Sequence, residues 1–514
     1  MHFVTMRLLT VLIAFLSARI FSHGCENFQT VKGDSGYCIC DSNYCDKVPN
    51  AMKTQDLLDY TIISSSKNGL RFQVNNGKFG NEIQGSTYIK ITIDQTKTYQ
   101  NILGFGGSLT DSVGVNLKSL SDDMQKKLLG SYFGPESIEY NLVRVPMGVS
   151  DFSARPYSYA MTENDFDLED FKLVEEDYEY KIPILKNINS MSERKVNLIA
   201  SPWSPSPWMK TVPEWNGNGL LRREYWQTWA NYFVKFFQEY KKEELYFWGT
   251  TVQNEPVIAH LMSVGMPTMT WYADDQREWL TKFLGPIMKK ADLDDIKIIV
   301  GDGQRALLTD YVPKILNTNE AKSVVSGIGA HWYFDWLTPL NTLDKMKNTY
   351  PGQFLIYTEA SEGVLEPPKV KLGSWKRAEN YARNIIDNLS HWVIGWIDWN
   401  MALNMQGGPN WVSNFVDSAI LVNASANAFY KQPMYYAMGH FSKFVPEGSQ
   451  RISTIKNGIH DIKHIAFLTP EKATVLVLMN PYSIRKNVFL EDASKGTVTL
   501  TLPENSIHTV VYWN

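Results

Sequence analysis

Residues 245–256 read LYFWGTTVQNEP, an apolar run of strand length that ends in an amide, a carboxylate and a proline. Valine, threonine and aromatic residues favour an extended backbone, and Pro256 biases the residue before it away from helical geometry. The pattern therefore predicts a buried strand that stops with Glu255 at its tip. Residues 353–359, QFLIYTE, form a second such run that ends in Glu359. One glutamate at a strand end is most often a solvated surface residue, so its interpretation depends on the other strands.

Eight short apolar runs alternate with longer amphipathic stretches between residues 101 and 400. This alternation is typical of βα units and a parallel sheet. Residues 222–242 form the clearest helical stretch, because their aromatic side chains recur at intervals of three and four, and residues 274–290 and 375–392 also fit. We therefore predict an α/β fold, a (β/α)8 barrel over residues 96–448. The eight runs begin at Asn101, Tyr140, Val196, Leu245, Ile296, Gly327, Gln353 and Gly395.

An open, doubly wound sheet is the alternative to the barrel. A dinucleotide-binding sheet of that kind carries a G-x-G-x-x-G turn that opens a helix, and the sequence contains no such motif. The nearest candidate is GFGG at residues 104–107. We assign its glycines to a tight turn at a strand end rather than to phosphate binding.

Two β-rich stretches flank the predicted barrel. Residues 51–95 and 449–514 contain short alternating runs separated by turn residues, and Asn457-Gly458 is a good two-residue hairpin turn. Each stretch alone has too few strands to bury a face. We therefore predict that the two stretches pair into one β-sandwich domain.

The N-terminal residues 1–24 contain a basic residue followed by a short apolar stretch. This stretch is shorter than the ~20 apolar residues that a membrane span needs, and no later stretch reaches that length. We predict a cleaved signal peptide and a soluble mature protein, with an N-terminal anchor as the alternative. Sequons at Asn388 and Asn423 predict N-glycosylation and agree with the secretory route.

All four cysteines, Cys25, Cys38, Cys40 and Cys45, lie in the following segment, residues 25–50. A zinc site would prefer two C-x-x-C pairs, so disulfides in an oxidising compartment are the better interpretation. Four cysteines allow three different disulfide pairings. Cys38 and Cys40 are too close together to be comfortable partners, which favours Cys25 with Cys38 and Cys40 with Cys45.

Charge and composition narrow the classes of partner. The formal net charge is −4 with nine histidines counted neutral, which argues against a nucleic-acid partner. At about pH 5 the protonated histidines should turn the sign positive, so attraction to anionic lipid is expected only in an acidic compartment. The 16 tryptophans and 26 tyrosines offer rings on which sugars stack, although core packing accounts for most of them.

In a (β/α)8 barrel the carboxyl ends of all eight strands meet at one face, where active sites lie. Polar and aromatic side chains end six of the eight predicted strands. A shared site is therefore the better interpretation of the two glutamates, and two acidic residues at such a rim are the minimum that a glycosidase needs. The residues at or just after these strand ends are Arg144, Asp151, Ser201, Pro202, Trp203, Asn254, Glu255, His331, Trp332, Tyr333, Glu359, Asp398, Trp399 and Asn400.

Several long motifs carry a family resemblance. They are SPWSPSPWMKT, VQNEP, AHWYFDWL, YTEAS, GWIDWNMALN, GGPNWVSNFVDS and FYKQPMYYAMGHFSKFVPEGSQR. From about Cys25 to its C-terminus, the chain resembles the eukaryotic lysosomal glucosylceramidases of glycoside hydrolase family 30. The resemblance implies a (β/α)8 barrel with a flanking β-sandwich. It also implies retaining hydrolysis of the β-glucosyl bond of glucosylceramide, a step of sphingolipid catabolism that requires no metal or organic cofactor.

The same resemblance implies roles for individual residues. Glu255 of QNEP matches the acid/base, Glu359 of TEAS matches the nucleophile, and Asn254 matches the amide that binds the sugar 2-hydroxyl. Arg144 and Tyr333 match groups that hold the nucleophile, and Tyr333 also borders the substrate. The residues that match the glucose pocket are Asp151, Trp203, Trp399 and Asn414.

Two features depart from the vertebrate family members, namely the loop 257–272 and Ser361, where those enzymes have a cysteine. The loop borders the pocket mouth, so the aglycone preference does not follow from the resemblance. One rival function is hydrolysis of another glycan, such as a β-glucan or a xylan. Another is a binding protein that carries lipid or glycan without turnover, which predicts loss of at least one carboxylate, whereas both are present.

The resemblance also implies partners and a location. The substrate lies in a membrane, so anionic phospholipid and a saposin-like activator protein are the expected partners of a peripherally associated enzyme. The expected location is the lysosomal lumen, reached through the secretory pathway. Secretion from the cell is the alternative.

Overall fold

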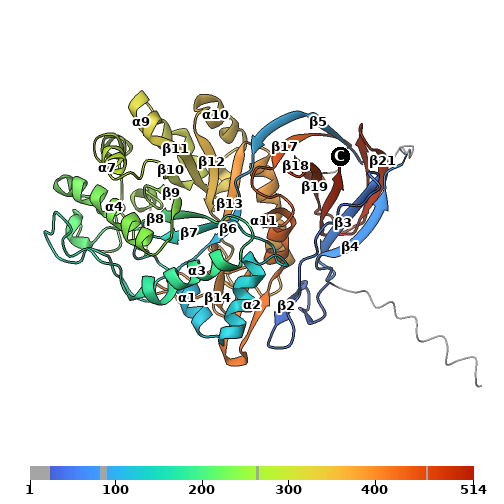
Figure 1. Ribbon diagram of the computed structural model, residues 1–514, viewed down its shortest axis with the longest axis horizontal. Helices are drawn as coiled ribbons and strands as arrows, with labels where there is room; N and C mark the ends of the chain where they lie inside the picture. Colours follow the sequence, from blue (N-terminus) through green and yellow to red (C-terminus); the bar gives the residue numbers. More distant parts are fainter. Residues whose placement is uncertain (1–23, 81–88, 262–264, 459–460) are drawn as a thin grey trace, which may run out of the picture.

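The computed structural model describes residues 24–80, 89–261, 265–458 and 461–514. The predicted signal peptide therefore lies outside the described residues, apart from Gly24. A barrel surrounded by helices and a β-rich lobe lie side by side (Figure 1). Within the described part of the chain, none of the helices combines the length and the apolar character of a membrane span.

Eight parallel strands close into a barrel, which confirms the predicted fold class. Neighbouring strands pair in chain order from β6 to β13, and the barrel closes where Trp396 of β13 lies in register with Phe105 of β6. The intervening helices form its outer layer (Figure 1). The strands are β6 (Gly104–Ser108), β7 (Leu142–Pro146), β8 (Asn197–Ser201), β9 (Phe247–Thr251), β10 (Lys297–Gln304), β11 (Val325–His331), β12 (Phe354–Glu359) and β13 (Val393–Asn400).

Branched aliphatic side chains form a core cluster contributed by the barrel strands and the segment before β6. Strands of a parallel sheet are buried on both faces and so read as continuous apolar runs, which is why the sequence reveals all eight. The buried members of the cluster are Leu103, Leu142, Ile199, Ile299, Ile356 and Ile397.

The GFGG motif lies inside strand β6, so its assignment to a tight turn at a strand end is wrong. A Cβ atom on Gly106 would stand 1.8 Å from the carbonyl oxygen of Leu142, its partner on β7. A Cβ atom on Gly104 would stand 1.8 Å from the amide oxygen of Asn141. These positions need glycine because neighbouring groups approach the backbone closely.

The three predicted helical stretches are helical, with shifts at their ends. The stretch 222–242 begins with a 3-10 turn, and the stretch 274–290 is interrupted by a π-helical turn at Leu280–Leu284. Pro286 follows that turn and has no N–H to continue the regular hydrogen-bond ladder. The α-helices are α1 (Asp111–Lys118), α2 (Asp122–Phe133), α3 (Ile182–Met191), α4 (Trp226–Lys242), α5 (Ile258–Leu261), α6 (Ala273–Trp279), α7 (Gly285–Lys290), α8 (Tyr311–Ile315), α9 (Asn319–Val324), α10 (Asn341–Thr349), α11 (Trp375–Leu389) and α12 (Pro433–Ser442).

Strands from both sides of the barrel segment share one nine-stranded sheet, as predicted, in the order β21-β20-β5-β17-β18-β19-β22-β3-β4. Its two edges meet where Gly80 and Thr497 exchange backbone hydrogen bonds of 2.9 and 2.8 Å. The sheet thus folds back on itself around its own core, which includes Ile91 and Leu476. Strand β5 runs past residue 95, the expected boundary. The strands are β3 (Asp59–Ser66), β4 (Gln73–Lys78), β5 (Ile89–Asn101), β17 (Gln450–Asn457), β18 (Lys463–Leu468), β19 (Ala473–Asn480), β20 (Lys486–Asp492), β21 (Gly496–Leu502) and β22 (Ser506–Trp513).

A third, five-stranded sheet is a feature that the sequence does not predict. It joins the cysteine-bearing segment to three strands that follow the barrel, in the order β1-β2-β16-β15-β14. Lys431 of β16 makes a buried ion pair with Asp46 at 3.1 Å, which fixes the segment to this sheet. The strands are β1 (Phe28–Thr30), β2 (Gly36–Cys40), β14 (Ala402–Asn404), β15 (Ile420–Asn423) and β16 (Ala428–Lys431).

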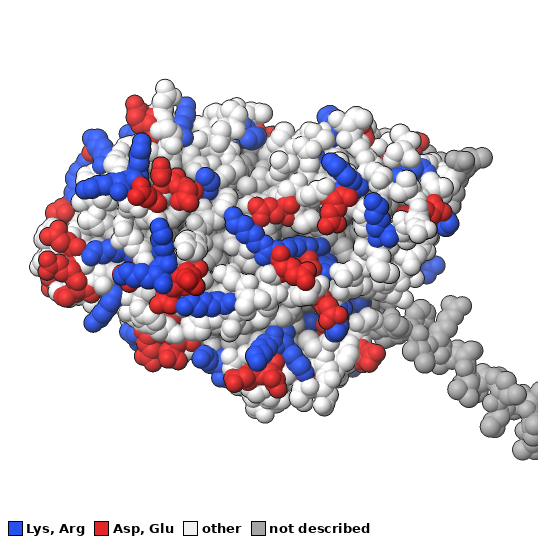
Figure 2. Space-filling model, viewed as in Figure 1, with Lys and Arg blue, Asp and Glu red and all other residues white. Residues whose placement is uncertain are grey.

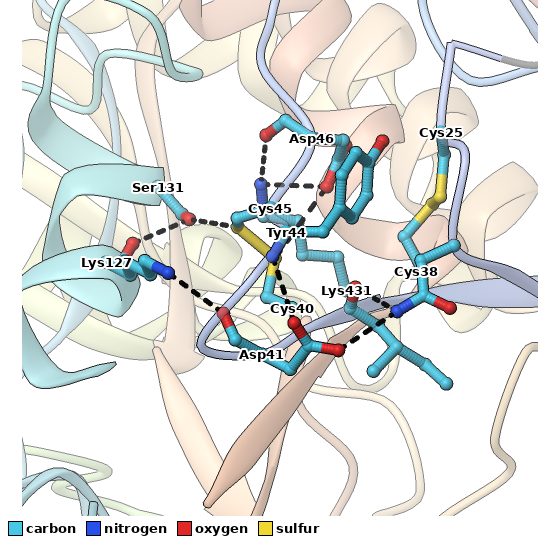
Figure 3. Close-up of a disulfide and its surroundings, with 12 residues drawn as sticks. Cys25, Cys38, Cys40, Asp41, Tyr44, Cys45, Asp46, Lys127, Ser131 and Lys431 are labelled. Carbon is cyan, nitrogen blue, oxygen red and sulfur yellow. Dashed lines mark hydrogen bonds and ion pairs between the residues drawn. A yellow bond between two sulfur atoms is a disulfide. The ribbon is translucent and has the colours of Figure 1, made fainter. Parts of the chain in front are cut away.

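Disulfides join Cys25 to Cys38 and Cys40 to Cys45, which confirms the favoured pairing (Figure 3). Asp46 lies close to the sulfur atoms of the second bridge. Because both of those sulfurs are oxidised, neither offers the thiolate that a metal ion would bind.

The predicted glycosylation of Asn388 is wrong for the folded chain. Its side chain is fully buried, Nδ2 donates to Oδ1 of Asn384 at 2.8 Å, and Oδ1 accepts from Arg305 at 3.2 Å. A glycan on that nitrogen would have no path to solvent. Asn423 is half-buried and lies beside exposed Ser425, so its glycosylation stays a prediction.

Candidate active site

Glu359 ends strand β12, and two donors hold its carboxylate. Arg144 of β7 donates from Nη1 to Oε2 at 2.5 Å, and Tyr333, which follows β11, donates its hydroxyl to Oε1 at 2.7 Å. Burial raises the pKa of Tyr333 well above its usual value, and the charge of Glu359 adds to the effect. The hydroxyl therefore keeps its proton, and both side chains stand where the family resemblance implies.

Glu255 does not stand at the tip of a strand, because β9 already ends at Thr251. It lies in a turn with φ 46°, in the left-handed region. Its N–H donates to the carbonyl oxygen of Asp302 at 2.8 Å, and the N–H of Asn254 donates to that of Pro202 at 2.9 Å. Hydrogen bonds to segments on both sides of β9 thus impose a conformation that residue preferences alone do not predict.

The two glutamates lie on either side of one histidine nitrogen. Glu255 Oε1 accepts from Nε2 of Gln304 at 2.5 Å and lies 2.8 Å from Nδ1 of His331, which is also 3.9 Å from Glu359 Oε1. The two glutamate oxygens can therefore be no further apart than the sum of the two histidine distances, 6.7 Å. Retaining glycosidases place their carboxyl groups about 5–5.5 Å apart and inverting ones about 6.5–9.5 Å, so this upper limit admits the retaining spacing and excludes nearly all of the inverting range.

A buried row of charges connects the two glutamates. His331 Nε2 lies 3.0 Å from Asp302 Oδ1, and Arg144 donates to Asp302 Oδ2 at 3.0 Å. Burial alone would lower the pKa of His331, but Glu359, Glu255 and Asp302 outweigh it and raise that pKa to about 10. Burial alone would raise the pKa of Asp302, but Arg144 and His331 hold it well below its usual range. Both groups are therefore charged at neutral and mildly acidic pH.

The sequence pattern places His331 at a strand end without an individual role, and it does not assign Asp302 or Gln304 to the site. The available signal for Asp302 and Gln304 is GDGQ, the polar end of the fifth strand, β10. The register of β10 against β11 shifts between Gly301 and Gly303, an irregularity that re-aims the side chain between them toward the site.

A cavity of about 420 Å³ opens beside the two glutamates, and every predicted substrate-binding residue lines it. The rings of Trp203 and Trp399 stack with centroids 5.2 Å apart and offer an apolar face. Asn414 donates from Nδ2 to Asp151 Oδ2 at 2.9 Å, which adds polar groups to the lining. A concave site with aromatic faces and a few converging polar groups suits a sugar ring. The predicted residues in the lining are Asp151, Trp203, Asn254, Glu255, Tyr333, Glu359, Trp399 and Asn414.

Two side chains of the cavity have their polar groups set by neighbours. Asn254 Oδ1 accepts from Nη2 of Arg144 at 2.9 Å, which leaves its amide nitrogen to donate toward a ligand. Burial raises the pKa of Asp151 to about 7, and the charge of Glu359 adds to the effect. Below about pH 7 Asp151 is therefore protonated, and its hydroxyl group can donate a hydrogen bond to a ligand.

The mouth of the cavity is formed by loops that follow the barrel strands. Gly265 and Met266 come from the divergent loop 257–272. A second hollow of about 750 Å³ adjoins the cavity, and Val364 and Leu365 line both. The space available to the group attached to the sugar is therefore bounded by loops rather than by the barrel itself.

Comparisons with known proteins agree with this geometry. The glycosyl hydrolase family 30 TIM-barrel domain matches residues 102–445, and the family 30 beta sandwich domain matches residues 448–510. The chain is 40% identical over 481 residues to the lysosomal acid glucosylceramidase of Mus musculus, which covers 92% of this chain and 93% of that one. Two solved structures are similar at 25% identity over 89% of this chain: SrfJ from Salmonella typhimurium, with a TM-score of 0.82 over 100% of its length, and an endo-β-1,6-glucanase, with 0.79 over 99%. The two family matches span the barrel and the sandwich, and the chain belongs to glycoside hydrolase family 30.

Proposed function

We propose that this protein hydrolyses the β-glucosyl bond of glucosylceramide to give glucose and ceramide, with retention of configuration at the anomeric carbon. The observation that carries the proposal is the pair Glu255 and Glu359, whose Oε1 atoms lie within 6.7 Å beside a cavity with aromatic faces. The 40% identity to the mouse lysosomal acid glucosylceramidase supports the choice of substrate.

The reaction proceeds by double displacement. The carboxylate of Glu359 attacks the anomeric carbon while Glu255 gives its proton to the departing oxygen, so ceramide leaves as an alcohol and glucose stays bonded to Glu359. Glu255 then takes a proton from water, whose oxygen attacks the anomeric carbon and releases glucose. Neither half of the reaction requires a metal ion or an organic cofactor.

The neighbouring side chains position the two reactants. Arg144 and Tyr333 each donate to a different oxygen of Glu359, which fixes the plane of the attacking carboxylate. Asn254 turns its amide nitrogen to the sugar 2-hydroxyl, a contact that strengthens in the transition state. The stacked pair Trp203 and Trp399 supplies the apolar surface against which the sugar packs.

A membrane substrate must be reached from the side of the cavity mouth. Three large apolar side chains stand exposed on the loops after β11 and β12: Trp336 at 76%, Leu337 at 60% and Leu365 at 55%. Trp336 and Leu365 also line the second hollow, so these side chains can enter a lipid surface beside the site. On the face shown in Figure 2, acidic and basic side chains are interspersed, which gives that face no strong attraction to anionic lipid.

The proposed location rests on the mouse relative, which is named lysosomal. We place the enzyme in the lysosomal lumen, peripherally bound to membranes that contain anionic phospholipid, with a saposin-like activator protein as a further partner. Secretion is the alternative. Sedimentation with anionic vesicles at acid pH should fall when salt is raised to ~1 M, where the Debye length is about 3 Å. Equal binding to neutral vesicles would count against the anionic-lipid partner.

A second candidate substrate is a β-1,6-glucan, because the fold is also similar to that of an endo-β-1,6-glucanase. The test incubates the protein at pH 5 with glucosylceramide in anionic vesicles and, in parallel, with a soluble β-1,6-glucan. The proposal predicts release of ceramide from the first and no new reducing ends from the second. Cleavage of the glucan without release of ceramide would replace the proposal. Glu359→Gln serves as the inactive control for both.

A further inference from the structure

Lys210 is a buried cation that the catalytic network does not use. Its side chain is 0% exposed. Its Nζ donates to the carbonyl oxygens of Glu214 at 2.6 Å, Thr268 at 2.7 Å and Trp215 at 3.2 Å, and it lies 3.2 Å from Oγ of Ser204. An ammonium has three N–H groups, so all of its donors are engaged.

These oxygens come from three segments, of which the first two are consecutive in the chain and the third lies more than forty residues later. The first, residues 203–210, begins at the wall of the cavity. The second is the excursion 211–221 before α4, and the third is the stretch 265–271 before α6. Main-chain hydrogen bonds also join the second to the third, from Thr268 to Trp215 at 3.0 Å and from Thr270 to Gly219 at 3.1 Å. The ammonium lies where the three segments meet.

Among side chains, other polar groups of these described segments contribute little to the junction. Within the described residues, the buried hydroxyls of Thr268 and Thr270 have no hydrogen-bond partner. In residues 203–221 and 265–271, Glu214 carries the only other charge, and its side chain is exposed. The ammonium therefore adds three carbonyl contacts to the main-chain hydrogen bonds that join these segments.

The third segment reaches the catalytic cavity, as the first does at Trp203. Gly265 and Met266 line the cavity just before Thr268, whose carbonyl binds the ammonium. They line the same cavity as Glu255, which protonates the departing oxygen. We infer that Lys210 is a positioning residue that sets the aglycone wall of the cavity and thereby the preference for the leaving group. The inference rests on the proposed hydrolysis of β-glucosides.

The charge of Lys210 makes this wall dependent on pH. Burial lowers the pKa of Lys210 to about 7, against the opposing attraction of Glu214. In acid the ammonium engages three carbonyl oxygens. Above pH 7 the neutral amine has two N–H groups and no charge to attract the carbonyl dipoles. The aglycone wall, which includes Met266, should therefore be well ordered in acid and become more mobile as the pH rises through 7.

Kinetics with hexyl and methyl β-glucoside test the inference, because the two share the sugar and differ in the aglycone. Lys210→Met removes the charge at similar length. It should raise KM for the hexyl glucoside about tenfold, on the scale of lost apolar contacts in a specificity pocket. Its kcat and KM for the methyl glucoside should stay within about twofold. The matched control is Lys235→Met, because Lys235 also donates to a backbone carbonyl, that of Leu168 at 2.7 Å, and does not line the cavity.

The pH dependence supplies a readout that a merely structural role would not move. In the wild type, the ratio of KM for hexyl to methyl glucoside should rise as pH passes 7, and Lys210→Met should abolish that rise. If Lys210→Met does not fold, two other measurements test the inference. One is the pH dependence of the KM ratio in the wild type, and the other is Met266→Ala, which should raise KM for the hexyl glucoside directly.

A wild-type ratio of KM for hexyl to methyl glucoside that does not change with pH would overturn the inference. An equal rise in KM for both glucosides in Lys210→Met would also overturn it. A wild type that hydrolyses both glucosides but not glucosylceramide would refute the proposed substrate and leave the inference to be judged on the two glucosides. A wild type that hydrolyses neither would refute the proposed function and the inference with it.

Discussion

At the scale of residues, the site is a row in which acidic and basic side chains alternate: Glu255, His331, Asp302, Arg144 and Glu359. Each inner member has a side chain of the opposite kind on both sides, at 3.0 Å or less, which offsets the free-energy cost of burying it. The two glutamates are the ends of one row, so the same contacts that bury the charges also fix the spacing of the catalytic pair.

Removing the central charge of this row should destabilise the fold. Asp302→Asn leaves Arg144 and His331 buried without their shared partner, and the free energy of unfolding should fall by about 3–5 kcal/mol, measured by urea denaturation at pH 7. Asp310→Asn is the matched control. It removes an exposed ion pair with Lys314 and should cost less than about 1 kcal/mol. Equal losses in the two variants would contradict the assigned role of Asp302.

At the scale of elements, the sequence predicts what depends on local patterns and misses what depends on neighbours. Long apolar runs identify all eight barrel strands because each is buried on both faces. The turn at Glu255 and the irregularity at Asp302 do not appear in the pattern, because hydrogen bonds between neighbouring segments create them. The role of the glycines at residues 104–107 does not follow from the sequence for the same reason, since it depends on which strand lies alongside.

The close approach at β6 predicts opposite effects for two glycine substitutions. Gly106→Ala would drive a Cβ atom into the backbone of Leu142 and should lower the free energy of unfolding by about 3 kcal/mol. Gly130→Ala, on helix α2, meets nothing within 4 Å and should raise it by about 0.4–1 kcal/mol. Thermal or urea unfolding measures both. If both substitutions changed the free energy of unfolding in the same direction, close approach of the backbone would not be the reason that β6 requires glycine.

At the scale of the whole molecule, histidines behave differently from the expectation that all nine become positive together near pH 5. Six of them lie within the described residues. His331 already carries its proton at neutral pH. Burial lowers the pKa of His440 well below its usual value and that of His508 to about 3. His440 of α12 contacts Thr509 of β22 at 2.9 Å and Ser65 of β3 at 3.0 Å, so neutral histidine joins the barrel to the sandwich.

These buried histidines predict a loss of stability in acid. His508 has a lower pKa folded than unfolded, so its contribution is fully present above pH 6.5 and is lost as the pH falls toward 3. At pH 5 the loss from this one group is about 2 kcal/mol. Urea denaturation at pH 7 and pH 5 should show a smaller drop in His508→Asn than in the wild type. His391→Asn is the control at a partly exposed site, and an unchanged drop in His508→Asn would contradict the account.

The pairing of flanking segments into one lobe and the two disulfides follow from the sequence, since too few strands and close cysteine spacing leave few choices. The five-stranded sheet does not follow, because β2 meets β16 across nearly the whole chain. The burial of Asn388 is missed for a related reason. A sequon is the short sequence that the glycosylating enzyme recognises. The burial of Asn388 near the end of α11 depends instead on contacts such as that with Arg305.

The central claim is that Glu359 attacks the sugar while Glu255 acts as acid and base. Peptide mass spectrometry after reaction with a mechanism-based 2-deoxy-2-fluoro-β-glucoside tests it most directly, because the fluorine slows release of the glucosyl-enzyme. We predict one covalent label, on Glu359, and none in Glu359→Gln. A label on Glu255, or continued hydrolysis with no covalent label, would contradict the assignment.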